Sequence, residues 1–169
     1  MKQLTKIAIA LGSNLGDREA FLRGAAGAFA LEFLERASGS SIYETEPWGI
    51  SDQPKYLNAV IVGWSEWKPP AILNFLKQIE RDLGRKATVR YGPREIDLDL
   101  LAYGEFTWKS EGLVVPHERL AEREFVLVPF AEVWPDWRHP ILGKTAGEIL
   151  AAGTFPNRPT LVSGRLLSD

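Results

Sequence analysis

Residues 90–101 read Arg-Tyr-Gly-Pro-Arg-Glu-Ile-Asp-Leu-Asp-Leu-Leu, and this stretch decides the fold that we predict. From Glu95 to Tyr103, acidic and aliphatic residues alternate without a breaker, which predicts a strand that follows a Gly-Pro turn. Successive side chains of a strand point to opposite faces. Asp97 and Asp99 therefore share one face, and the aliphatic side chains next to them share the other.

This pair of carboxylates needs a compensating positive charge. Neighbouring carboxylates on a largely buried strand repel each other and lose hydration. Mg²⁺ suits such a pair because it takes one or two carboxylates and completes its shell with water and substrate phosphates. Five basic residues, against the single acid Asp82, lead into the strand and favour phosphate binding: Arg81, Arg85, Lys86, Arg90 and Arg94. A lone Asp-x-Asp pair or a lone basic loop is more often a solvated surface feature, so only their combination predicts a metal-phosphate site.

Composition limits the class of protein. The chain has 169 residues, of which 45% are hydrophobic, and we expect one domain over residues 1–169 with a core at about 4–110 and an extension at about 111–169. The net charge of −2 gives no global attraction to nucleic acid or to membranes. The chain has no cysteine, so disulfides and thiolate chemistry are excluded. We expect a cytoplasmic protein, because the apolar run from Ile7 to Leu11 is too short for a signal sequence or a membrane span.

Hydrophobic periodicity predicts the order of the elements. Strands are expected at 7–11, 40–45, 56–64 and 95–103, with a helix capped by Asp17 and a second helix from Pro69 to Gly84. This β-α-β-β-α-β order predicts an α+β, ferredoxin-like core, a mainly antiparallel sheet flanked by helices. The C-terminal extension is expected to hold a hairpin around 106–108, a segment at 113–115 and helices at about 122–133 and 145–151. Thr145 and Glu148 form a predicted capping box.

The connection at residues 46–55 is longer than a hairpin needs, and it is either a functional lid or a variable surface loop. Trp48 in this loop needs a flat or apolar surface to cover it. Tyr56 and Asn58 share a strand face, so the three residues could form a slot for a flat heterocycle. The alternative is that the loop backbone satisfies Tyr56 and Asn58. At the turn after the first strand, Gly12 lets another group approach closely.

Three further features of the C-terminal part bear on function. His117, Arg123 and Phe125 lie close together at the start of a predicted helix, where anions are favoured. His139 is expected at the surface or in a loop. Gly143-Lys144-Thr145 is not a phosphate loop, because Arg138 stands where the motif requires glycine.

Four motifs in this order resemble those of the 6-hydroxymethyl-7,8-dihydropterin pyrophosphokinases of folate biosynthesis. They lie at residues 10–16, at 45–58 from Thr45-Glu46-Pro47 to Asn58, at 91–99, and at 116–127 from Pro116-His117 to Arg123-Glu124-Phe125. The resemblance implies transfer of diphosphate from ATP to a pterin alcohol, with release of AMP. It also implies small-molecule substrates alone, without nucleic acid or membrane, and we expect a monomer.

By this resemblance Asp97 and Asp99 would hold two Mg²⁺ ions, and Arg85 and Arg94 would assist the transfer. The residues implied to bind ATP are Leu73, Glu80, Arg85, Arg90, Tyr91, Arg94, Leu100, His117 and Arg123. The residues implied to bind the pterin are Gly12, Thr45, Glu46, Pro47, Trp48, Tyr56, Asn58, Asp97 and Phe125. The chain departs from the family pattern at Tyr91, where the family often has Trp. Its basic loop between Gly84 and Arg90 is also about one residue shorter than in well-known members of the family.

Two other functions fit parts of the sequence. A ferredoxin-like module that binds RNA or a regulatory nucleotide would explain the fold and the basic loop, but the third strand lacks the aromatic signature of an RNA-recognition sheet. A different Mg²⁺-dependent kinase would release ADP instead of AMP. The products formed from ATP distinguish these alternatives.

Overall fold

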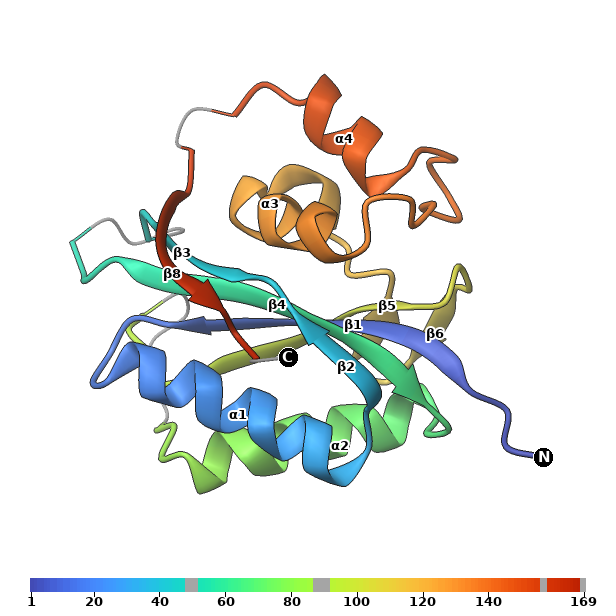
Figure 1. Cartoon of the computed structure of the whole chain (residues 1–169), viewed down its shortest axis with the longest axis horizontal. Coiled ribbons are helices and arrows are strands. Elements are labelled where there is room, and N and C mark those ends of the chain that lie inside the picture. Colours follow the sequence, from blue (N-terminus) through green and yellow to red (C-terminus); the bar gives the residue numbers. More distant parts are fainter. Residues whose placement is uncertain (48–51, 87–91, 156–157, 168–169) are drawn as a thin grey trace.

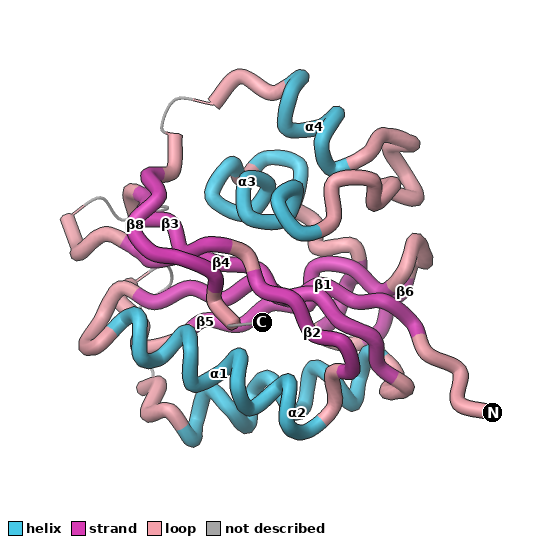
Figure 2. Tube along the Cα trace, in the orientation of Figure 1, coloured by secondary structure: helices cyan, strands magenta, loops and turns pink. Residues whose placement is uncertain are grey.

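One antiparallel sheet forms the middle layer of the molecule (Figures 1 and 2). The computed structural model describes residues 1–47, 52–86, 92–155 and 158–167. Strands of the sheet follow the order β5-β1-β4-β3-β8, and β2 also pairs with β4. Their bounds are β1 Thr5–Ser13, β2 Glu35–Gly39, β3 Ser41–Thr45, β4 Tyr56–Ser65, β5 Asp97–Tyr103 and β8 Thr160–Arg165.

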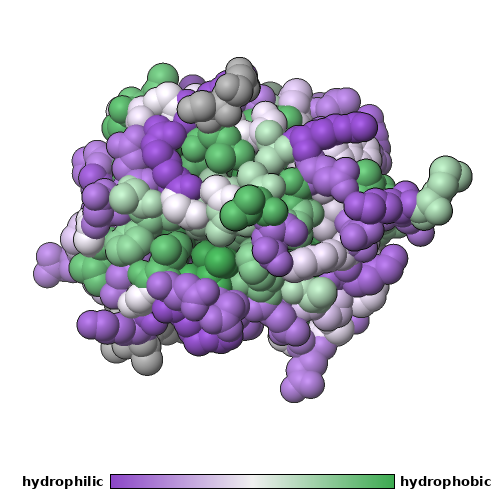
Figure 3. Space-filling model, turned by 60° about the horizontal axis from the view of Figure 1, so that its bottom comes forward, coloured by the Kyte–Doolittle hydropathy of each residue, from purple (hydrophilic) through white to green (hydrophobic). Residues whose placement is uncertain are grey.

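Helices cover both faces of this sheet. Helices α1 (Arg18–Glu32) and α2 (Pro69–Asp82) lie on one face, and α3 (Glu124–Val133) and α4 (Ala146–Ala152) lie on the other (Figure 1). Alternation along β1 produces the two cores: Ile7, Ile9 and Leu11 belong to the cluster under α1 and α2, whereas Ala8 belongs to the cluster under α3 and α4. Figure 3 turns the side of α1 and α2 forward and shows hydrophobic areas among hydrophilic ones.

The predicted strands and helices of the first 110 residues are present, with shifts of a few residues at their ends. Asp17 caps α1, and its side chain accepts a hydrogen bond from the backbone N–H of Ala20 at 3.2 Å. Strand β5 begins at Asp97, two residues later than expected. The alternation of β5 side chains between the two faces is interrupted once, at a bulge where Leu101 has no partner on β1.

The C-terminal part differs more from the prediction. The expected hairpin around 106–108 is instead formed by β6 (Trp108–Ser110) and β7 (Leu113–Val115), which turn at Gly112 with a φ of 71°. A 3-10 helix, Leu120–Glu122, precedes α3, which starts two residues later than expected. Thr145 and Glu148 form the predicted capping box of α4.

Two strands were not predicted. β2 is polar and contains Arg36 with a φ of 53°, so its sequence lacks the alternation of a half-buried strand. β8 extends the sheet beyond β3, so the extension adds an edge strand as well as the hairpin and helices.

His139 lies in a loop, which is one of the two expected places, but it is buried there and not at the surface. It is 8% exposed, and its Nδ1 accepts backbone hydrogen bonds from Ile141 and Leu142 at 3.1 and 3.2 Å. Burial lowers the pKa of His139.

Within the described residues, no helix is long and apolar enough to cross a membrane.

Candidate active site

The two carboxylates of β5 lie opposite the smallest side chains of β1. Asp97 pairs with Gly12, and Asp99 pairs with Ala10. Both carboxylates lie on the face of the sheet that α3 covers, because their neighbour Leu98 belongs to the core under α1 and α2. The small partners on β1 leave space above the acids, so a cavity forms there.

This first cavity has a volume of about 210 Å³. It lies between the sheet and the start of α3, and both aspartates line it. Its lining residues are Ala10, Leu11, Gly12, Thr45, Glu46, Tyr56, Asn58, Arg94, Asp97, Asp99, His117, Arg123, Phe125 and Val126.

A second cavity of about 490 Å³ adjoins the first. Leu73, Leu98, Leu100 and residues of the β6–β7 hairpin line its apolar side, and Glu118 and Arg119 also contribute. Asp99, His117 and Arg123 line both cavities. A site with two compartments that share charged residues can hold two substrates and transfer a group between them.

Two arginines pair with Asp97. The Nη1 atoms of Arg85 and Arg94 each lie 3.2 Å from Asp97 Oδ1. Arg85 also bonds to Glu80, whose Oε2 accepts the backbone N–H of Leu98 at 3.0 Å. Burial raises the pKa of Glu80. This arrangement connects the end of α2 to the start of β5.

Asp99 is the costlier carboxylate to ionise. Burial, followed by the neighbouring charge of Asp97, raises its pKa to about 7. A divalent cation beside the pair would reverse this effect, because it stabilises both carboxylates in the charged form. Among the described residues, no cluster of three or more His, Cys, Asp or Glu could hold a metal. A pair of carboxylates on one strand face fits an ion that takes its other ligands from water and phosphate, as Mg²⁺ does.

His117 can donate a hydrogen bond into the shared region. Its backbone N–H donates to the carbonyl of Leu101 at 3.0 Å, and its Nδ1 accepts the backbone N–H of Arg119 at 3.2 Å. Burial, followed by the charge of Arg123, lowers the pKa of His117, which favours the neutral ring. In a neutral ring whose Nδ1 accepts, Nε2 carries the proton. That Nε2–H is the donor available to a phosphate oxygen.

The inner end of the first cavity carries polar groups that are fixed in place. Asn58 is 7% exposed, and its Nδ2 donates to Thr45 Oγ1 at 2.6 Å. A Cβ at position 12 would lie only 3.0 Å from Asn58 Oδ1 and 3.5 Å from the ring of Tyr56. A side chain at position 12 would therefore have to displace Asn58 slightly. Near α3, the guanidinium of Arg123 lies 5.6 Å from the ring of Phe125.

The structure brings most of the predicted site residues together. Of the implied pterin residues, Gly12, Thr45, Glu46, Tyr56, Asn58, Asp97 and Phe125 line the first cavity. Of the implied ATP residues, Leu73 and Leu100 line the second cavity, His117 and Arg123 line both, and Arg94 lines the first. Glu80 and Arg85 reach the site through Asp97. Their roles stay predictions.

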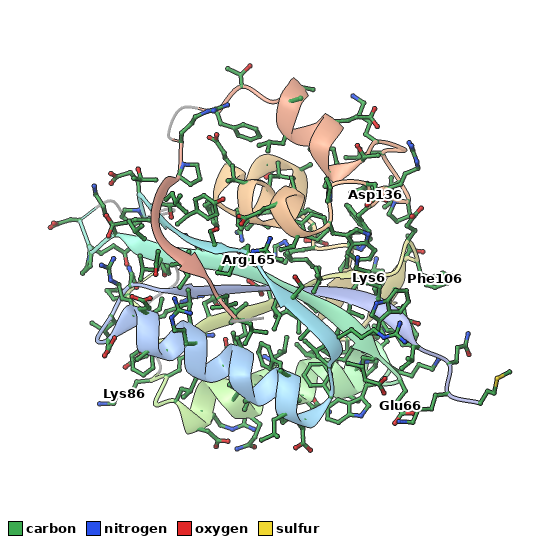
Figure 4. The ribbon with its side chains drawn as sticks, in the orientation of Figure 1. Lys6, Glu66, Lys86, Phe106, Asp136 and Arg165 are labelled. Carbon is green, nitrogen blue, oxygen red and sulfur yellow. The ribbon has the colours of Figure 1, made fainter. Side chains whose placement is uncertain are left out.

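Among the predicted site residues that the structure describes, Pro47, Glu80 and Arg85 line neither cavity. Pro47 follows the exposed Glu46. Trp48, Arg90 and Tyr91 lie outside the described residues. Lys86, a basic residue of the loop after α2, is exposed and points away from the sheet (Figure 4).

Sequence reasoning gave no role to Asn14, which joins three segments around the site. Asn14 is 1% exposed, and its Nδ2 donates to Gln53 Oε1 at 2.9 Å and to the carbonyl of Pro54 at 3.0 Å. Its Oδ1 accepts the backbone N–H of Arg94 at 2.8 Å. The signal in the sequence was an Asn at the end of a buried strand, which is a polar group that needs partners.

Comparison with known proteins points to one family. The family model described as 7,8-dihydro-6-hydroxymethylpterin-pyrophosphokinase matches residues 8–135. A 2-amino-4-hydroxy-6-hydroxymethyldihydropteridine pyrophosphokinase of Bacillus subtilis is 44% identical over 126 residues, which cover 74% of this chain and 75% of the relative. The protein of that name from Methylorubrum extorquens is 42% identical over 154 residues, covering 88% of this chain and 93% of the relative.

Longer proteins also match. The mitochondrial folate synthesis bifunctional protein of Arabidopsis thaliana is 44% identical over 133 residues, which are 76% of this chain and 23% of that protein. The chain thus spans about a quarter of the length of the plant relatives it matches. The crystal structure of Plasmodium falciparum HPPK-DHPS with pterin and p-hydroxybenzoate has the same fold, with a TM-score of 0.69 at 13% identity, over 88% of this chain and 43% of that chain.

Proposed function

Because the chain belongs to the 7,8-dihydro-6-hydroxymethylpterin-pyrophosphokinase family, we propose that it transfers the terminal diphosphate of ATP to 6-hydroxymethyl-7,8-dihydropterin and releases AMP. The observation that carries this proposal is the pair of adjoining cavities that share Asp99, His117 and Arg123. A diphosphate that passes from one cavity to the other must cross this shared region.

The first cavity would hold the pterin. Thr45, Tyr56, Asn58 and Phe125 line it, and the pterin ring is flat with hydrogen-bonding edges. Asn58 is held by Thr45, so its amide is fixed before the ligand arrives. The second cavity would hold the nucleotide, with its base near the apolar residues Leu73 and Leu100.

Transfer requires the pterin hydroxyl oxygen to attack the β-phosphorus of ATP while the bond from that phosphorus to the AMP oxygen breaks. Arg94 and Arg123 would bind the phosphate oxygens and stabilise the charge that develops on them. His117 would donate its Nε2–H to another phosphate oxygen. Asp97, which faces the pterin cavity, would accept the hydroxyl proton.

We further propose that Asp97 and Asp99 hold Mg²⁺, with two ions as the expected number. Bound there, Mg²⁺ would neutralise the phosphates and polarise the transferred group. The support is the donor set itself: two carboxylates on one strand face, of which Asp99 is costly to ionise without a cation. Arg85, which now pairs with Asp97, would then be released to contact phosphate.

Predictions about the fold, the domain, the oligomeric state and the cellular location also belong to this proposal. The strand order β5-β1-β4-β3 and the two helices on one face support a ferredoxin-like core. The mutual packing of the C-terminal helices and β8 with the core supports a single domain over residues 1–169. That the protein is monomeric and cytoplasmic stays a prediction.

Product analysis tests the reaction. The protein is incubated with ATP, Mg²⁺ and 6-hydroxymethyl-7,8-dihydropterin, and the nucleotides and pterins are separated by ion-exchange chromatography. We expect AMP and pterin diphosphate in equal amounts, and neither product when EDTA is added. Release of ADP would indicate a different kinase, and unchanged ATP would refute the proposal.

A further inference from the structure

The C-terminal strap, defined here as residues 153–155 and 158–167, lies beyond the region that matches the family model. It runs from the end of α4 to the open edge of the sheet (Figure 1). Phe155 packs against the core under α3 and α4. Beyond it, β8 pairs with β3, with Thr160 opposite Glu44 and Leu161 opposite Tyr43. The strap therefore connects the layer of α3 to the edge of the sheet.

The far end of the strap is firmly attached. Leu166 is 2% exposed in the core, and its N–H donates to the carbonyl of Ser40 at 2.7 Å. Arg23 of α1 donates to the carbonyls of Arg165 and Leu166 at 2.9 and 3.1 Å. These bonds fix the course of the strap independently of any ligand.

One ion pair joins the strap to the start of α3. Arg158 Nε lies 3.5 Å from Glu124 Oε1, and the two side chains are 88% and 5% exposed. The other carboxylate oxygen, Oε2, is buried and has no hydrogen-bond partner in the part of the chain that the structure describes. Burying a carboxylate with so few partners costs stability. A glutamate at position 124 therefore serves a purpose other than stabilising the fold.

The position of the pair suggests that purpose. Arg123 and Phe125, the neighbours of Glu124, line the first cavity at the start of α3, and Thr45 and Glu46 line it at the end of β3. Arg158 lies two residues before Thr160, which pairs with Glu44 next to Thr45. Through the strap, the pair thus connects the start of α3 to β3, and both of these segments contribute residues to the cavity.

We propose that Glu124 and Arg158 are positioning residues that hold the first turn of α3 against β3 and thereby set the width of the pterin cavity. Neither side chain lines that cavity, so they act through Arg123 and Phe125. This inference rests on the proposed function, because the pterin is the ligand whose fit would change. The nucleotide cavity shares Arg123 with this turn, but its apolar side is formed by the β6–β7 hairpin, Leu73 and Leu100.

The test compares Arg158→Ala, Arg158→Lys and Glu124→Gln with Arg165→Ala as the matched control. Arg165 is also exposed and lies on β8, and its backbone carbonyl accepts a hydrogen bond from Arg23 (Figure 4). Its charge acts on Glu132, at the other end of α3, so the control removes one positive charge from the same strap without touching the Glu124 pair. Calorimetry measures Kd for the pterin, with Mg²⁺ and a non-hydrolysable ATP analogue present, and Kd for the analogue alone. Hydrogen exchange of residues 123–127 is measured in the ligand-free proteins.

We expect Arg158→Ala and Glu124→Gln each to raise the pterin Kd about three- to fivefold, the range that one partly exposed ion pair supports. The nucleotide Kd should change less than the pterin Kd, because the two cavities share only Arg123 of this turn. Arg158→Lys should restore pterin binding, and hydrogen exchange at residues 123–127 should accelerate in Arg158→Ala and Glu124→Gln. The inference is overturned if only Tm falls while the ratio of the two Kd values stays constant, or if Arg165→Ala has the same effect. If wild type does not bind the pterin, the proposed function fails instead.

Discussion

Replacing Asp99 by Asn should stabilise the metal-free protein at neutral and alkaline pH while it abolishes diphosphate transfer. The reason is the raised pKa of this carboxyl, about 7 in the folded protein against an ordinary value of 3.8. Between these two values the folded protein binds more protons than the unfolded chain, so this group lowers stability as pH rises from about 4 to 7. Asn has nearly the same shape and never ionises, so the variant escapes this loss.

The size of the effect follows from the difference between the two pKa values. A difference of about three corresponds to roughly 4 kcal/mol once the group is fully ionised, which is an upper limit. Asp99 is partly exposed to the cavity, and water there screens its charge, so we expect about 1–2 kcal/mol. For a chain of this length, that free energy raises Tm by about 3–6 °C.

The assay is thermal unfolding of both proteins in EDTA at several pH values from 4.5 to 8. The difference in Tm between Asp99→Asn and wild type should be smallest at the acidic end and should grow to its full value at pH 8. His117 and His139, whose pKa values are lowered, stabilise the protein as pH rises through the range below 6.5, which is the opposite trend. Because both proteins share these groups, the difference isolates Asp99.

Two results would refute this reasoning. A difference in Tm that does not change with pH would mean that Asp99 is not the titrating group. A variant that is less stable than wild type at pH 8 would mean that the carboxylate is already compensated by the protein. Adding Mg²⁺ with an ATP analogue should raise the Tm of wild type only, because Asn is a poor ligand for this ion.

Four other substitutions test the rest of the site. Asp97→Ala should lower kcat by roughly two or more orders of magnitude with an unchanged circular dichroism spectrum, and near wild-type turnover would contradict the metal assignment. Trp48→Ala should weaken pterin binding far more than ATP binding in calorimetry, whereas equal losses would mean that the slot is misplaced. Gly12→Ala should raise KM for the pterin about tenfold and leave KM for ATP unchanged, because the added Cβ would lie 3.0 Å from Asn58 Oδ1. Asn14→Ala should cost about 2 kcal/mol in urea unfolding, since it leaves buried partners unsatisfied, and a loss under 0.5 kcal/mol would show that the bonds contribute little.

The sequence predicted the elements whose side chains repeat with a clear period. β1, β4 and β5 are apolar on at least one face, and α2 has an apolar stripe, so local patterns were enough to find them. The placement of Asp97 and Asp99 on one face followed from the two-residue period of a strand.

Features that depend on distant residues could not be predicted. β8 exposes Leu161 and Val162 and contains Gly164, so its sequence resembles a loop, and only pairing with β3 makes it a strand. Similarly, Glu124 and Arg158 look like ordinary surface charges in the sequence, although one of them is buried. Tertiary contacts decide these cases, and local propensity carries no information about them.

The cavity above the aspartates depends on both kinds of information. Ala10 and Gly12 look like ordinary small residues of a buried strand until β1 and β5 are paired, and the register then sets each of them opposite an acid. A larger side chain at either position would fill the space where a metal and phosphates must fit. The acids on β5 supply the charge, and the small residues on β1 supply the room. The chemistry of the site therefore depends on a pairing that neither strand specifies alone.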